Sequence, residues 1–370
     1  MFLCFENREM KILILSNSSV GIWQFRRELV QRLLEVKHSV YLSVPREQYF
    51  DEFEKLGVHC IETRISRHGV NPFADFRLFL NYLSMIRKIK PDIVFSYTIK
   101  PNVYGGMACQ ACKVPYLANV TGLGTAIQNG GLLQKISLML YKMGLKGAKR
   151  VFFQNSENHR FMVDKGIVSA PTTILPGSGV NLEHFAYEDY PSDENGIRFL
   201  FVGRIMRDKG ICELLEAARA IKGEYSNVAF DVVGGYDGAF ETIIRNAHDE
   251  GIIKYHGMQN DVRPFYRACH CVVLPSYHEG MANVLLEGAA TGRPLIATNI
   301  PGCREIFEQD VTGFGCEARN AESLYAAVKK FIGLPSGIRI TMGKKARERM
   351  EQHFSRDIVI GKYLLECENM

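Results

Sequence analysis

The chain has 370 residues, of which 46% are hydrophobic and 23% charged, and its formal net charge is +5 at pH 7. The length favours two domains over one, and the composition excludes an intrinsically disordered chain. So small a net charge, without basic tracts interleaved with aromatic residues, gives no reason to expect a nucleic acid partner.

The ten cysteines are scattered along the chain. Cys109 and Cys112 form a lone CxxC without the second pair that a zinc ribbon needs, so two thiols in or near a packed helix are the favoured interpretation. Residues 1–9 are too short for a signal sequence or a membrane span, and no apolar run elsewhere is long enough to cross a bilayer. We therefore expect reduced thiols and a cytoplasmic protein; whether residues 1–9 are translated stays open.

Apolar runs of strand length alternate with amphipathic stretches of helix length through the first half of the chain. Strands are predicted at residues 11–16, 39–44, 58–62, 92–97, 114–119 and 151–154, and helices at 22–37, 49–56 and 71–90. The first strand is followed by a polar loop, residues 17–21. This alternation predicts a doubly wound parallel sheet.

The composition changes near residues 171–196, where prolines, glycines and acidic residues form a polar connection. A second series of strands is predicted at 197–202, 228–233, 252–256, 271–275, 294–297 and 313–316. The fold class is therefore α/β, with two Rossmann-like parallel-sheet domains at 10–185 and 186–353. Open parallel sheets bind ligands at the carboxyl ends of their strands, so a cleft faced by both domains is the expected site.

The first strand of the second domain ends in a basic loop. Gly203 and Arg204 close the strand, and Lys209 follows five residues later, before a predicted helix. Glycine permits a close approach of the backbone, and two cations on one loop can neutralise a diphosphate as negative charge develops on it. A solvated basic turn is the alternative.

The strongest chemical signal is the segment from His278 to Glu287, which follows an apolar strand. Glu279 lies in a loop beside Gly280, and Glu287 lies about one turn into the helix that follows. The N-terminus of that helix, near Ala282 or Asn283, offers N–H groups to a phosphate. Glu279 is placed to reach a sugar hydroxyl, and Glu287 a ribose.

These motifs resemble family 4 of the retaining glycosyltransferases, which have the GT-B fold. Residues 278–287 resemble the E-x7-E motif of that family, and residues 201–210 (FVGRIMRDKG) resemble its strand with Arg and Lys. Further similar segments are residues 292–297, 301–306 and 312–314. The resemblance therefore covers almost the whole second domain.

The resemblance implies a role for each matching residue. Arg204 and Lys209 would bind the donor diphosphate, Glu279 the transferred sugar and Glu287 the ribose. The backbone of Gly280, Met281, Ala282 and Asn283 would hold phosphate. The loop ending at Gly21 would lie close to the donor phosphates, and a last helix, within 354–370, would cross back to the first domain.

The first domain resembles the family more loosely. Residues 97–105 and 119–124 are similar to a branch that builds surface polysaccharides or lipid-linked oligosaccharides. Many members carry a histidine at the end of the fourth strand, where this sequence has Thr121 followed by Gly122, so the orientation of the donor sugar is in doubt. We expect both residues to lie near the sugar or the acceptor.

The resemblance implies retaining transfer of a hexose or N-acetylhexosamine from a UDP-sugar to an undecaprenyl-diphosphate-linked saccharide. No Asp-x-Asp follows a strand, and a cationic pair can replace a divalent ion at the diphosphate, so neither metal nor cofactor is expected. The alternatives are a GT-B enzyme that acts on a soluble acceptor, a nucleotide-sugar hydrolase or epimerase, and a non-catalytic sugar-nucleotide-binding protein. A dehydrogenase is disfavoured because residues 16–21 lack the Gly-x-Gly-x-x-Gly pattern.

Residues 132–150 mix apolar side chains with four lysines and an arginine. At helical spacing this pattern indicates a basic amphipathic face suited to an anionic membrane surface, which would make the protein peripheral on the inner face of the cell membrane. The alternative is a helix that faces the core and has a solvated basic side. The donor sugar, the acceptor, the linkage and the oligomeric state are not determined by the sequence.

Overall fold

The computed structural model describes residues 9–65, 71–123, 131–236 and 238–370, which divide into two compact units. The first unit takes in the chain up to Ser178 together with Val359–Met370, and the second comprises Gly179–Ile358. The boundary between them precedes the predicted one at 185–186. Val180 donates its N–H to the carbonyl of Phe354 and accepts from the N–H of Arg356, which ties residues 179–185 to the second unit.

A seven-stranded sheet in the order β3-β2-β1-β4-β5-β6-β7 forms the centre of the first unit. Its strands are β1 (Lys11–Leu15), β2 (Ser39–Val44), β3 (His59–Glu62), β4 (Ile93–Tyr97), β5 (Tyr116–Val120), β6 (Arg150–Phe153) and β7 (Thr172–Ile174). Every neighbouring pair is parallel. The order reverses between β1 and β4, which is the switch point at which such sheets bind ligands.

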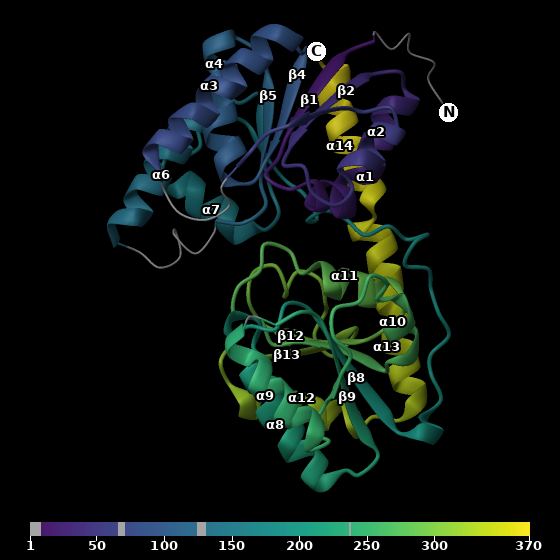
Figure 1. The fold of residues 1–370 in the computed structure, drawn as a ribbon. Helices are drawn as coiled ribbons and strands as arrows, with labels where there is room; N and C mark the ends of the chain where they lie inside the picture. The colour runs from purple at the N-terminus through teal and green to yellow at the C-terminus, as the bar shows by residue number, and fades with distance from the viewer. Residues whose placement is uncertain (1–8, 66–70, 124–130, 237) are drawn as a thin grey trace. The chain divides into compact units, whose positions relative to one another are not determined.

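Helices cover both faces of this sheet (Figure 1). They are α1 (Ser19–Glu35), α2 (Phe50–Lys55), α3 (Pro72–Ile89), α4 (Gly106–Cys112), α6 (Gly131–Leu145), α7 (Ser156–Asp164) and α14 (Arg356–Glu368). A single π-helical turn, Pro101–Gly105, precedes α4. Ile12 and Ile14 point to the core shared with α1, α2 and α14, whereas Leu13 and Leu15 point to the core shared with α3, α4 and α6. Burial on both faces explains the continuous apolar strands of the sequence.

The second unit repeats this plan with six strands in the order β10-β9-β8-β11-β12-β13. They are β8 (Ile197–Val202), β9 (Val228–Val233), β10 (Lys254–Tyr255), β11 (Cys271–Leu274), β12 (Leu295–Thr298) and β13 (Gly313–Cys316). The helices are α8 (Ile211–Glu224), α9 (Glu241–Asp249), α10 (Arg263–Ala268), α11 (Asn283–Ala290), α12 (Ala321–Ile332) and α13 (Ser336–Arg349), with a π-helical turn at Met350–Phe354. All the strand pairs are again parallel.

Helix α14 belongs to the first unit from Val359 onward. Its Tyr363 hydroxyl accepts a hydrogen bond of 2.8 Å from the side chain of Asn119 at the end of β5. Glu366 pairs with Arg150 and lies 3.7 Å from the Nζ of Lys149. The last helix therefore completes the core of a unit whose other elements lie near the start of the chain.

The observed elements depart from the predicted ones in several places. Helix α1 begins at Ser19, because the Ser18 side chain caps it, so the predicted loop 17–21 is shorter than expected. The predicted polar connection contains β7, whose Thr172–Ile174 pairs with β6. The strand predicted at 252–256 contracts to two residues at the edge of its sheet.

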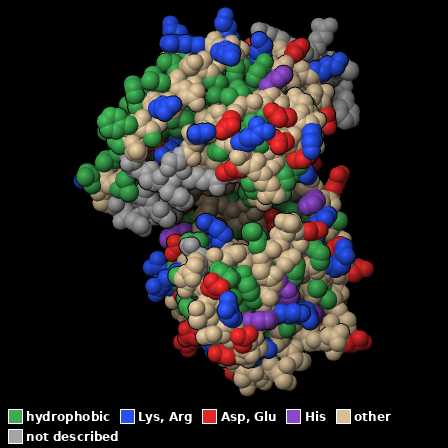
Figure 2. Space-filling model, in the orientation of Figure 1, with side chains coloured by type: hydrophobic (Ala, Val, Ile, Leu, Met, Phe, Trp, Pro, Cys, Tyr) green, Lys and Arg blue, Asp and Glu red, His purple; other side chains and the backbone are tan. Residues whose placement is uncertain are grey.

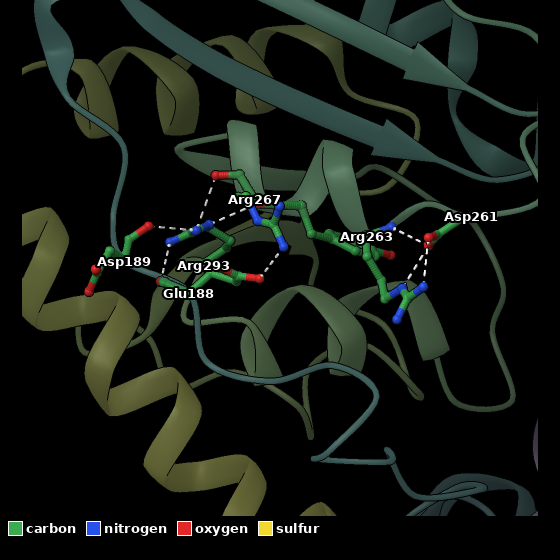
Figure 3. A network of polar contacts seen from close by, with 7 residues as sticks. Glu188, Asp189, Asp261, Arg263, Arg267 and Arg293 are labelled. Carbon is green, nitrogen blue, oxygen red and sulfur yellow. Dashed lines mark hydrogen bonds and ion pairs between the residues drawn. The ribbon is translucent and has the colours of Figure 1, made fainter.

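A buried arginine fastens the connection to the second unit (Figure 3). The Arg293 side chain is fully buried, and its guanidinium donates to the carbonyls of Tyr266, Arg267, Glu188 and Asp189 at 2.8 to 3.2 Å. Glu188 in turn pairs at 2.7 Å with the exposed Arg267 side chain, which lowers the pKa of Glu188. One cation thus satisfies carbonyls from two separate segments of chain.

Replacing Arg293 with methionine should lower the stability of the second unit by at least about 3 kcal/mol, because several buried carbonyls would lose their donors at about 1–3 kcal/mol each. The matched control is Arg267→Met, which removes an exposed ion pair worth at most about 1 kcal/mol. Urea unfolding followed by circular dichroism measures both variants. Equal shifts in their midpoints would contradict the role given to Arg293.

Candidate active site

The candidate site lies at the carboxyl edge of the second sheet. Three loops meet there: residues 203–210 after β8, residues 275–282 after β11 and residues 299–306 after β12. These strands are neighbours in the sheet, and its order reverses between β8 and β11. The predicted residues Arg204, Lys209 and Glu279 therefore emerge at the switch point of the sheet, where ligands bind.

Lys209 and Glu279 form an ion pair across the switch point. The Lys209 Nζ lies 2.5 Å from Oε1 of Glu279, although the residues are 70 positions apart in the chain. Both side chains are mostly buried. A close pair of opposite charges in partly desolvated surroundings holds both side chains in position. The fold thus brings together two of the three residues predicted to carry the chemistry.

Backbone packing fixes the loops that carry this pair. Gly210 adopts a φ of +72°, and a Cβ there would lie 2.0 Å from the carbonyl oxygen of Pro275. The N–H of Tyr277 donates to the carbonyl of Asp208 at 2.8 Å. Because only glycine combines this φ with so close an approach, residue 210 sets the distance between the two loops.

Arg204 is exposed at the start of the β8 loop. Among the described residues, its guanidinium has no hydrogen bond or ion pair with any other side chain or backbone group. Gly203, just before it, donates its N–H to the carbonyl of Val233, so the strand geometry continues up to Arg204. Arg204 is therefore a solvated cation on the same loop as Lys209, which already has a partner.

The segment predicted to hold phosphate divides into two parts. The N–H of Ala282 donates to the carbonyl of Gly302 at 2.8 Å, so this amide is not available to a ligand as predicted. Gly302 has a φ of +82°, and a Cβ there would lie 2.7 Å from the carbonyl oxygen of Gly280. Met281 and Ala282 are buried. The amides that open α11, beginning with Asn283, are available to an anion, because a helix leaves its first N–H groups without partners.

Glu287 lies in the second turn of α11 and accepts a hydrogen bond of 2.9 Å from the hydroxyl of Tyr266. Burial raises the pKa of Glu287 to about 7, against the Tyr266 hydrogen bond and the positive charge of Arg356, which both lower it. The carboxyl group is therefore about half ionised near neutral pH, whereas an exposed glutamate would be fully ionised.

The remaining predicted residues lie in the first unit. Gly21 is inside the first turn of α1, and its N–H donates to the Ser18 hydroxyl at 3.1 Å. The sequence predicts that Gly21 ends a loop facing the phosphates. In the structure Gly21 lies inside the helix instead, because the Ser18 cap starts the helix earlier. Thr121 and Gly122 directly follow β5 and are half-buried at the carboxyl edge of their sheet.

Tyr266, Gly302 and Arg356 are not among the residues that the sequence predicts for the site. Tyr266 lies on α10 and Arg356 opens α14, so no local motif connects either with Glu287. Gly302 stands in a Pro-Gly pair, whose turn signal was available in the sequence. Across the described residues, no group of three or more His, Cys, Asp or Glu side chains is arranged to hold a metal ion.

Two family models match the chain, one in each half. Residues 11–155 match the model for glycosyl transferase 4-like proteins, and residues 196–333 match that for group 1 glycosyl transferases. Among curated relatives, the chain is 27% identical to an N,N'-diacetylbacillosaminyl-diphospho-undecaprenol alpha-1,3-N-acetylgalactosaminyltransferase of Campylobacter jejuni, over 96% of this chain and 97% of the relative. It is 26% identical to a UDP-Gal:alpha-D-GlcNAc-diphosphoundecaprenol alpha-1,3-galactosyltransferase of Escherichia coli, over 70% and 71% of the two chains.

Solved structures share the fold over nearly the whole chain. A glycosyltransferase from Rickettsia africae has a TM-score of 0.80 at 19% identity and covers 98% of both chains. Anabaena HepE, solved in complex with UDP and glucose, has a TM-score of 0.79 at 17% identity and covers 98% of this chain and 100% of its own. These matches confirm the predicted fold class of two Rossmann-like domains. The chain is a glycosyltransferase with the GT-B fold, built from a glycosyl transferase 4-like half and a group 1 glycosyl transferase half.

Proposed function

We propose that this glycosyltransferase moves a hexose or N-acetylhexosamine from a UDP-sugar, with retention of configuration, to an undecaprenyl-diphosphate-linked saccharide during surface polysaccharide synthesis. The observation that supports the assignment of the donor is the Lys209–Glu279 ion pair, with the exposed Arg204 on the same loop as Lys209. The acceptor half is supported by the Campylobacter jejuni and Escherichia coli relatives, whose names specify diphospho-undecaprenol acceptors. Such an acceptor places the enzyme on the inner face of the cell membrane.

The two cations suit the departure of a nucleoside diphosphate. As the bond between the sugar C1 and the diphosphate oxygen breaks, negative charge develops on the diphosphate, and Arg204 and Lys209 would stabilise it. The acceptor hydroxyl forms the new bond to C1 and transfers its proton to that diphosphate oxygen. Retention follows because the acceptor approaches from the face that the diphosphate leaves, and no protein nucleophile is required.

Glu279 and α11 would position the donor. Glu279 is held by Lys209 at 2.5 Å, which leaves its second carboxylate oxygen for a sugar hydroxyl. The N-terminus of α11 would receive a phosphate oxygen. Glu287 has two carboxylate oxygens, of which Tyr266 engages one, so the other can accept from a ribose hydroxyl.

UDP should raise the melting temperature of the purified protein, because a ligand that binds only the folded state stabilises it by about 2.7 kcal/mol at 100 times its Kd. We would screen UDP, GDP, ADP, NAD and a panel of UDP-sugars by differential scanning fluorimetry. Stabilisation by UDP and one UDP-sugar supports the proposal. Stabilisation by NAD alone would overturn it.

Arg204→Gln should reduce kcat by about 10²–10³-fold, since it removes a cation that acts on charge developing in the transition state. Arg207→Gln is the control, because Arg207 is an exposed cation on the same loop with no proposed part in the reaction. Initial rates with the donor found in the screen measure both variants. If both turned over at the wild-type rate, the diphosphate assignment would be wrong.

Affinity for the UDP-sugar should rise between about pH 6 and 8. The Glu287 carboxyl has a pKa of about 7, and ionisation makes it a better acceptor for ribose hydroxyls. A UDP-sugar is the suitable probe because its diphosphate diester does not titrate in this range. Glu287→Gln should bind more weakly at pH 8 and lose the pH dependence in isothermal titration calorimetry. If Glu287→Gln kept the wild-type dependence of UDP-sugar affinity on pH, another titrating group would be responsible for that dependence.

Transfer should continue in the presence of a chelator, because the proposed charge stabilisation comes from Arg204 and Lys209 rather than from a metal. The measurement compares initial rates in EDTA with rates in added Mg²⁺ and Mn²⁺. A rate that falls at least tenfold in EDTA and recovers with either metal would contradict a purely cationic side-chain mechanism.

A further inference from the structure

Two helices of the first unit expose large apolar side chains along their outer faces. On α3, Phe73 is 88% exposed and Phe76 61%, and on α6, Leu132 is 74% exposed and Met139 65%. The α3–α6 surface is defined here by the exposed residues Phe73, Phe76, Leu80, Leu132, Leu133, Ile136, Met139 and Met143. Scattered apolar residues are ordinary on a protein surface, but eight on two helices that both pack against α4 are not.

Helix α4 joins the two helices into one surface. A cavity of about 300 Å³ lies between these helices. It is lined by Phe79 of α3, Met107 and Gln110 of α4, Met143 of α6 and Lys146, which directly follows α6. Figure 2 shows hydrophobic side chains gathered over this part of the first unit. The exposed apolar residues therefore lie on two helices that border one hollow.

These residues are not the core-facing side of α6. Helix α6 buries Tyr141, Gly144 and Leu145, which pack toward α4 and the turn before it. The exposed Leu132, Ile136 and Met139 recur at helical spacing on the other side. The alternative, a helix that faces the core and has a solvated basic side, explains why Tyr141, Gly144 and Leu145 are buried. It does not explain the exposed apolar residues on the opposite side of α6.

The exposed charged side chains of α3, and of α6 with the turn after it, are all positive. They are Arg77, Arg87 and Lys88 on α3, and Lys135, Lys142 and Lys146 on and after α6. The acidic residue of α3, Asp75, is buried and pairs with Lys100 at 2.7 Å. In the sequence, no Asp or Glu occurs between Asp92 and Glu157. Two helices that carry both exposed apolar side chains and exposed cations complement an anionic lipid surface.

The position of this surface matches its proposed use. Helix α3 begins after the carboxyl end of β3, and α6 begins after the carboxyl end of β5. Three of the four most exposed residues of this surface, Phe73, Leu132 and Phe76, lie at these beginnings, on the edge of the sheet that also carries Thr121 and Gly122. A membrane-bound lipid would thus enter the first unit at the edge where parallel sheets bind their ligands.

We propose that the α3–α6 surface docks the enzyme on an anionic phospholipid bilayer, with the apolar side chains at the level of the acyl boundary and the lysines and arginines on the lipid headgroups; this rests on the proposed lipid-linked acceptor. It extends the basic segment predicted at 132–150 by a second helix and removes two residues from it. Lys149 donates to the carbonyl of Glu366 at 2.7 Å, and Arg150 pairs with the Glu366 carboxylate, so both serve α14 instead of the membrane. None of the helices in the described part of the chain combines the length and apolarity that a bilayer span requires.

The test is co-sedimentation of the full chain with vesicles of phosphatidylglycerol and phosphatidylethanolamine, without donor or acceptor. Wild type should bind, and binding should weaken with salt. The triple variant Phe73→Ser, Phe76→Ser and Leu132→Ser should bind at least about tenfold more weakly, because binding scales with the apolar area inserted. The matched control is Ile243→Ser with Ile338→Ser, which removes exposed apolar residues from the second unit and should bind like wild type.

A second set separates charge from insertion. Lys135→Gln, Lys142→Gln and Lys146→Gln should each lower affinity by about fivefold, and together should reduce the preference for phosphatidylglycerol over phosphatidylcholine vesicles. The proposal would be overturned if the serine triple variant bound vesicles as tightly as wild type. It would also be overturned if the wild-type protein did not co-sediment with vesicles. A wild-type dimer that the serine variant converts to monomer, without vesicle binding, would assign the surface to a second copy of the chain.

The UDP-induced shift in melting temperature distinguishes this proposal from the proposed function. It should be equal in wild type and in the serine variant, which also shows that the variant folds. Vesicle binding without a UDP-induced shift would contradict the proposed donor and support the membrane-docking surface. A UDP-induced shift without vesicle binding would support the donor and contradict the membrane-docking surface.

Discussion

The contact between Gly210 and the carbonyl of Pro275 is the constraint on which the candidate site depends. Two loops that leave neighbouring strands at the switch point would ordinarily diverge, because the helices that follow them lie on opposite faces of the sheet. The absent side chain at residue 210 lets the loops touch, and the hydrogen bond between Asp208 and Tyr277 holds them. Lys209 and Glu279 then meet without any motif that spans both. Gly302 does the same for the loops after β11 and β12.

Much of this architecture was accessible from the sequence. Strands β2, β8, β9 and β13 have the predicted limits, because strands buried on both faces are unbroken apolar runs. The predicted fold class and family are confirmed by both family models and by the solved structures. The resemblance implied that Glu279 and Lys209 both bind the donor, but the ion pair between them was not predicted.

The parts that the sequence did not provide depend on tertiary contacts. Ser18 as a cap moves the start of α1 back to Ser19, before Gly21, and one polar residue among several in that loop cannot be singled out beforehand. The use of the Ala282 amide by Gly302 depends on a loop twenty residues away. The environment of Glu287 depends on Tyr266 and Arg356, which come from different helices. To predict which side chains of α3 and α6 are exposed, one likewise has to know which side of each helix is buried.

The order in which the chain is made gives the last helix a particular consequence. Val359, Tyr363 and Cys367 belong to the same core as Ile12 and Ile14, and the Asn119 side chain donates to Tyr363. Domains usually fold in the order in which they leave the ribosome, with the first domain complete before the second. Here the first unit cannot close its core until the final dozen residues have been synthesised, after the second unit has emerged. The half of the enzyme that is made first is therefore the half that is finished last.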